Sequence, residues 1–88
     1  MPSWSLRFDE GAERELAALD RAMARRIGEK LTWLSENADE VRHLPLRFAL
    51  SGSYKLRVGD WRVIYRLLEP ERVVFVVALG HRSEAYEE

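Results

Sequence analysis

Basic residues occur at even spacings on both sides of a short turn. Lys55 and Arg57 precede the Gly59-Asp60 pair, and Arg62 and Arg66 follow it. Guanidinium groups are planar, charged forks that match phosphate oxygens, so this cluster could bind and polarise a phosphodiester. Neither flanking segment contains an acidic residue that would neutralise these cations from within the same hairpin.

The turn predicts how these side chains face one another. Residues 54–58 and 61–68 are strand-like, and a two-residue connection containing glycine predicts a tight antiparallel hairpin. In that register Arg57 lies opposite Arg62, and like charges in direct opposition cost up to about 1 kcal/mol. We interpret the tolerated repulsion as an anion site; the alternative is a solvated sheet face whose arginines pair with helix carboxylates. The face predicted to be basic carries Lys55, Arg57, Arg62, Ile64 and Arg66.

The preceding half of the chain predicts a strand and two helices. Residues 4–8 alternate apolar and polar side chains, which is typical of a half-buried strand. Apolar residues then recur at steps of three or four from Ala12 to Leu34, which predicts a helical face directed at a core. Asp9 and Asp20 suit N-caps, so we expect two helices over residues 10–19 and 21–36.

The remaining elements complete the expected fold. The chain is extended around Pro45, residues 47–50 could form a short strand, and residues 72–80 are apolar on both faces, as in an interior strand. We therefore predict one α+β domain spanning residues 1–88, with a small antiparallel-rich sheet and an N-terminal helical hairpin packed on one face. The predicted order is β-α-α-β-β-β(-β).

Composition narrows the functional classes. The 88 residues carry a net charge of −1 and no cysteine, which excludes disulfides, thiolate metal sites and cysteine nucleophiles. No cluster of acids and histidines has metal-ligand spacing, so we expect neither a metal nor a cofactor. No apolar run approaches the roughly 20 residues that span a membrane, so the predicted location is cytoplasmic.

The small net charge is the sum of acidic and basic blocks that are separated along the chain. Residues 1–41 sum to −3, residues 42–82 carry eight basic residues against three acids, and residues 83–88 sum to −3. A basic block between two acidic ones is compatible with an anionic partner for one face. The total argues against a broad basic surface but permits a small phosphate site.

The stretch from Tyr54 to Arg66, followed by Gly80-His81-Arg82 and Tyr86, resembles the RelE/ParE superfamily of type II toxins. The resemblance covers nearly the whole chain and implies a cognate antitoxin as partner. RelE-like members cut messenger RNA on the ribosome, whereas ParE-like members inhibit DNA gyrase and lack the full basic set with its terminal tyrosine. The chain has a residue at each position of the RelE-like catalytic set: Lys55, Arg57, Arg62, Arg82 and Tyr86.

The RelE-like resemblance implies an endoribonuclease that uses ribosome-bound messenger RNA. Arg57 and Arg62 would hold the scissile phosphate, and Lys55 would act as base or as a further stabiliser. Arg82 would assist the leaving group, and Tyr86 would stack on or orient a nucleotide. His81 is an alternative base.

Arg47 and Arg66 are the further RNA-binding candidates, on the basic block outside the catalytic set. Two other functions stay open at this point. One is a gyrase inhibitor without nuclease activity, and the other is a weakened toxin that chiefly binds its antitoxin.

Overall fold

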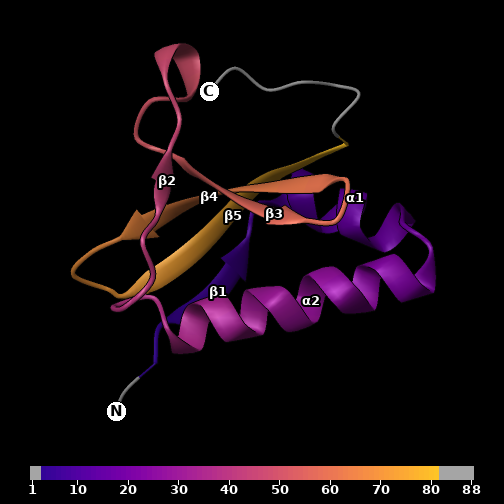
Figure 1. Ribbon diagram of the computed structural model, residues 1–88, viewed down its shortest axis with the longest axis horizontal. Helices are drawn as coiled ribbons and strands as arrows, with labels where there is room; N and C mark the ends of the chain where they lie inside the picture. Colours follow the sequence, from indigo (N-terminus) through magenta and orange to yellow (C-terminus); the bar gives the residue numbers. More distant parts are fainter. Residues whose placement is uncertain (1–2, 82–88) are drawn as a thin grey trace.

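The computed structural model describes residues 3–81, which form one mixed sheet and two α-helices. The sheet order is β1-β5-β4-β3-β2, with β1 parallel to β5 and every other neighbouring pair antiparallel (Figure 1). The predicted α+β class is therefore confirmed. The elements are β1 (Ser5–Phe8), α1 (Glu10–Ala18), α2 (Arg21–Glu36), β2 (Leu44–Pro45), a 3₁₀ turn η1 (Phe48–Leu50), β3 (Tyr54–Val58), β4 (Trp61–Leu68) and β5 (Val73–His81).

Both helices begin where the sequence predicts. The Asp9 carboxylate accepts a hydrogen bond from the Gly11 amide at 2.9 Å, and that of Asp20 accepts one from the Met23 amide at 3.3 Å. Each cap satisfies a backbone donor that the first helical turn leaves unpaired. The extended backbone of Asp20 also separates α1 from α2.

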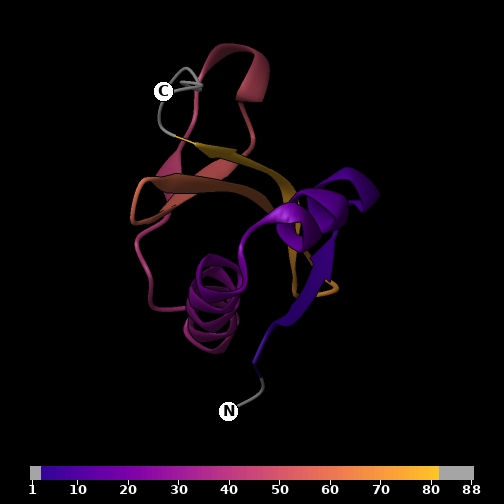
Figure 2. The same cartoon turned by 90° about the vertical axis from the view of Figure 1, so that its right-hand side faces the viewer.

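The hydrophobic core lies between the helices and one face of the sheet. Figures 1 and 2 show α1 and α2 on the same side of the strands. Neither α1 nor α2 covers the opposite face, and the alternation along the hairpin directs its basic residues to that face. No helix among residues 3–81 is long and apolar enough to cross a membrane. The buried core comprises Trp4, Ala12, Ile27, Leu31, Leu34, Ala38, Val58, Val63, Tyr65, Val74, Val76 and Leu79.

The pairing of β5 with β4 is irregular at one point, and beyond that point a hydrogen bond joins β5 to α1. Ile64 pairs with Ala78 but Tyr65 pairs with Val76, so β5 has one extra residue at this point, as in a β-bulge. The parallel partner β1 reaches only as far as Val76. Beyond it, the Leu79 amide donates to the Glu15 carboxylate at 3.0 Å, which supplies an acceptor where β1 has ended.

One detail differs from the sequence prediction, and a second was not predicted. Residues 47–50 are not a strand: Phe48 has a φ of 58°, and the Ser51 amide donates to the Phe48 carbonyl at 2.9 Å, which closes a 3₁₀ turn. Ile64 is completely buried, although it alternates with arginines on the basic face. It lies on an interior strand between Lys55 and Ala78. The basic face therefore has an apolar residue at its centre.

Gly59 is required by the β3–β4 turn. Its φ of 62°, at the first of two turn positions, is typical of a type II′ turn, where glycine is preferred. A β-carbon there would also lie 3.1 Å from an Arg26 guanidinium nitrogen. We expect Gly59→Ala to lower the free energy of unfolding by about 1–2 kcal/mol, measured by urea denaturation.

Gly28 provides the matched control for this substitution. It lies inside α2 and nothing is within 4 Å of the position of its absent β-carbon. Gly28→Ala should therefore stabilise the protein by about 0.5–1 kcal/mol, because alanine has the higher helix propensity. Equal effects of the two substitutions would contradict the assigned turn conformation.

Candidate nucleic-acid interface

The hairpin has the register that its sequence predicts. Arg57 and Arg62 are direct cross-strand partners, and Lys55 is paired with Ile64. The β-carbons of such pairs lie about 5 Å apart, so the two arginine side chains leave the sheet from adjacent points. Their side chains extend from the face opposite the helices.

Arg62 occupies an interior position in the sheet. It lies on β4, the central strand of the sheet, with Arg57 on one side and Gly80 on the other. Arg62 and Lys55 are half-buried, whereas Arg57 is exposed. A half-buried guanidinium on a central strand is held in place by its neighbours. It is therefore well suited to act as a fixed hydrogen-bond donor to a phosphate.

Lys55 and Arg57 line different surface hollows. Lys55 contributes to a hollow of about 480 Å³ together with Leu44, Pro45 and Arg47. Arg47, selected from the sequence as an RNA-binding candidate, therefore borders the same hollow as Lys55. The second hollow, of about 490 Å³, lies between α2 and β3 and is lined by Arg26, Glu29, Lys30, Trp33, Arg57, Val58 and Gly59.

The cations on α2 were not among the residues selected from the sequence. Arg26 and Lys30 are four residues apart on one helix face, a spacing that could have indicated a shared surface. Their proximity to Arg57 depends on how α2 packs against the sheet. Lys30 also lies over the Trp33 ring, with its ammonium nitrogen 4.2 Å from the ring centroid.

The other selected residues are distributed as follows. Arg66 is exposed on β4, and one of its guanidinium nitrogens lies 3.6 Å from where a β-carbon on Gly52 would be, beside the loop between β2 and β3. Arg82 and Tyr86 lie outside the described residues. His81 is paired with Trp61, and their rings meet edge to face with centroids 5.2 Å apart. The His81 side chain therefore leaves the sheet from the face opposite that of Arg62.

His43 joins the loop after α2 to the underside of the hairpin. Its Nε2–H donates to the Ala38 carbonyl at 2.8 Å, which leaves Nδ1 to accept from the Tyr65 hydroxyl at 2.5 Å. Burial, with a smaller contribution from Tyr54, raises the pKa of the Tyr65 hydroxyl, so this group stays protonated as the donor. The sequence showed no partner for His43, because Tyr65 is 22 residues away.

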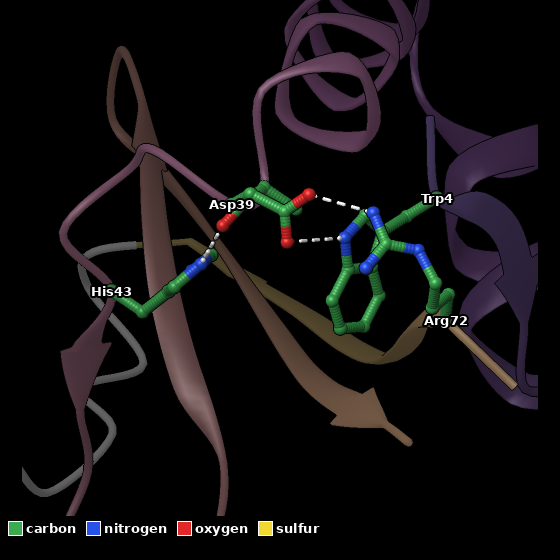
Figure 3. Close-up of polar contacts among 5 residues, drawn as sticks. Trp4, Asp39, His43 and Arg72 are labelled. Atoms are coloured by element: carbon green, nitrogen blue, oxygen red, sulfur yellow. Dashed lines mark hydrogen bonds and ion pairs between the residues drawn. The ribbon is translucent and has the colours of Figure 1, made fainter. Parts of the chain in front are cut away.

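A second polar cluster holds the same loop against β1. The Asp39 carboxylate accepts from the Trp4 indole at 3.0 Å and from the Arg72 guanidinium at 2.6 Å (Figure 3). Arg72 also lies over the Trp4 ring, with its guanidinium carbon 4.9 Å from the ring centroid. Arg72 belongs to the basic block of the sequence, but these contacts give it a structural role.

This cluster makes stability dependent on pH. The Arg72 and Trp4 hydrogen bonds hold the pKa of the Asp39 carboxyl below its ordinary value of 3.8. A lowered folded-state pKa stabilises the fold above pH 3.8, and the contribution disappears as pH falls through the lowered value. We expect the melting temperature of the wild type to exceed that of Asp39→Asn at pH 6, and the difference to shrink below pH 3.8. A difference that is constant with pH would contradict this assignment.

Comparison with known proteins places the chain among bacterial and archaeal toxins. Residues 6–86 match the family of ParE toxins of the type II toxin–antitoxin system parDE. The mRNA interferase toxin RelE of Escherichia coli is 30% identical, over 98% of this chain and 93% of the relative. Toxin RelG of Mycobacterium tuberculosis is also 30% identical, over 94% of this chain and 95% of the relative.

Solved structures have the same fold. The toxin–antitoxin complex RelBE2 from Mycobacterium tuberculosis contains a chain that aligns with a TM-score of 0.81 and 28% identity, covering 94% of this chain and 95% of that one. A chain of the RelE–RelB complex of Pyrococcus horikoshii aligns at 0.74 and 25% identity, covering 96% and 100%. The RelE-like arrangement of two helices and a mixed sheet is thereby confirmed. The family match and the near-full-length relatives together show that this chain belongs to the RelE/ParE superfamily of type II toxins.

Proposed function

We propose that this toxin is a ribosome-dependent, metal-independent endoribonuclease that cleaves messenger RNA and is neutralised by a cognate antitoxin. The observation that carries the proposal is the direct Arg57–Arg62 pair with Lys55 on the same face of the hairpin. A relative that is named as an mRNA interferase, and that is 30% identical over nearly the full length, also supports the proposal.

The basic face can supply what metal-free RNA cleavage requires. The 2′-hydroxyl must lose a proton to attack the adjacent phosphorus, and the phosphoryl oxygens must be stabilised as charge develops. Arg57 and Arg62 would hold these oxygens, and Lys55 would take the proton. Arg82 would assist departure of the 5′-oxygen, and Tyr86 would orient a nucleotide. The departing 5′-oxygen would take its proton from water, with its charge stabilised by Arg82. The products would be a 2′,3′-cyclic phosphate, or the 3′-phosphate that water forms from it, and a 5′-hydroxyl.

The charge distribution supports dependence on a larger assembly. With a net charge of −1, the protein lacks the broad basic surface that gives tight, sequence-independent binding to free RNA. The ribosome would supply the missing binding energy by presenting the messenger to the small basic site. Because this setting requires ribosomes, the proposed location is the cytoplasm.

The antitoxin is the second expected partner. The similar chains from Mycobacterium tuberculosis and Pyrococcus horikoshii were solved in complexes with RelB antitoxins. We propose that the corresponding partner of this chain covers the basic face, with acidic side chains against the Arg57–Arg62 pair. Bound in that way, it would exclude RNA from the site.

Primer extension on a reporter messenger after brief induction tests the nuclease. We expect new 5′-hydroxyl ends within the translated region, and none on a control messenger that lacks its start codon. Growth arrest with DNA-damage signalling and an intact messenger would instead identify a gyrase inhibitor. Absence of growth arrest would identify a weakened toxin. Either result would overturn the proposed nuclease.

A further inference from the structure

Phe48 has an unusual backbone conformation for an aromatic residue. Its φ of 58° lies in the left-handed region, where a side chain with a β-carbon is strained and glycine is preferred. The residue is 74% exposed, so packing does not compensate for this strain. Strained residues that the surrounding structure maintains are concentrated at ligand-binding sites.

The loop that presents Phe48 is anchored at its base. The Leu46 amide donates to the Ser53 carbonyl at 2.9 Å, and both residues are buried. Inside the loop, the Leu50 amide donates to the Arg47 carbonyl at 3.1 Å. In Figure 1 the η1 loop projects from the sheet beyond β2, away from both helices. The aromatic ring is therefore carried outward by a structured turn.

Cations surround the base of this loop. Arg47 precedes Phe48 and shares the 480 Å³ hollow with Lys55. The Arg66 guanidinium reaches the other end of the loop, at Gly52. No acidic residue occurs between positions 41 and 59. The surroundings of the exposed ring are therefore complementary to a polyanion.

We propose that Phe48 is a stacking platform for an unpaired base of the substrate RNA. The adjacent backbone phosphates would lie on Arg47 and Arg66. Because Arg47 shares a hollow with Lys55, the proposed base, the stacked nucleotide would lie next to the reacting one. Aromatic stacking suits single-stranded RNA because every base has a π-face, and neighbouring cations hold the backbone. This inference rests on the proposed nuclease function and adds a residue that positions its substrate.

Phe48→Gly separates stacking from any structural role. Because glycine adopts a φ of 58° without strain, the melting temperature should rise by about 4 °C. The affinity for a single-stranded RNA hexamer with 2′-O-methyl groups, which block cleavage, should fall about tenfold, as measured by NMR titration at low salt. Phe48→Trp should restore the affinity because it restores an aromatic surface.

Leu68→Ala is the control. Leu68 is also an exposed large apolar residue, at 37%, but it is the last residue of β4 and lines neither hollow, so its removal should leave RNA affinity unchanged. A fall in melting temperature for Phe48→Gly would show that the ring is structural and overturn the proposal. Unchanged RNA affinity would also overturn it, including the case in which only antitoxin binding weakens.

The two proposals can fail separately. If the wild type leaves messenger RNA intact while Phe48→Gly still weakens binding of the hexamer, the nuclease proposal is wrong, and Phe48 stacks on RNA without positioning a substrate for cleavage. If the wild type cleaves messenger and Phe48→Gly binds the hexamer normally, the nuclease stands and the platform is wrong.

Discussion

Arg62→Ala should lower the rate of messenger cleavage about 100- to 1,000-fold while leaving the protein folded. Arg62 lies half-buried on the central strand, between Arg57 and Gly80, so its hydrogen-bond donors are fixed before RNA arrives. Loss of one such preorganised donor from a developing oxyanion typically has an effect of this size. Stability should be equal or slightly higher, because the repulsion between the paired arginines is removed.

Single-turnover cleavage of messenger on purified ribosomes gives the rate directly. Arg62→Lys should be intermediate, because it retains the charge but loses the planar two-donor fork. Arg14→Ala is the control: Arg14 is an exposed arginine on α1 that pairs with Glu10 at 3.5 Å. Cleavage by Arg62→Ala at the wild-type rate would show that this residue does not contact the reacting phosphate.

Lys55→Arg should lose as much activity as Lys55→Ala, more than 100-fold in each case. A guanidinium cannot give up its proton in a protein, so arginine preserves the charge but cannot act as the base. Lys55 is the only lysine of the hairpin and lies between Leu44 and Ile64 on the adjacent strands. The alternative base, His81, pairs with Trp61 and starts from the opposite face of the sheet.

The same ribosome assay distinguishes the two roles considered for Lys55. Lys30→Arg is the matched control, since Lys30 is an exposed lysine on α2 that lines the other hollow. It should cleave at the wild-type rate. If Lys55→Arg retains activity and Lys55→Ala does not, Lys55 stabilises charge and the base lies elsewhere.

The local features of this protein follow directly from its sequence. The helix starts at Asp9 and Asp20 and the pairing of Arg57 with Arg62 were predicted and are confirmed. Each depends on interactions within a few residues: a side-chain oxygen that caps the nearest amides, or a two-residue turn that sets the strand register. The resemblance in residues 54–66 also identified the superfamily correctly.

Features that depend on contacts between distant residues could not be predicted from the sequence. The parallel pairing of β1 with β5 and the Asp39–Trp4–Arg72 cluster join residues more than 30 positions apart. The positive φ of Phe48 could not be predicted either. An aromatic residue type argues against it, and the hydrogen bonds of an anchored loop maintain it.

The basic site has features of both kinds, some set by the local sequence and others by contacts between distant segments. Its members and their alternation along the hairpin were determined by the sequence, because a strand places every second side chain on one face. Only the tertiary structure decided which neighbours they have. Lys55 shares a hollow with Arg47, Arg57 borders a hollow that residues of α2 also line, and Ile64 is buried between Lys55 and Ala78. These relationships depend on how the helices and the β2–β3 loop pack against the sheet, and local periodicity carries no information about that packing.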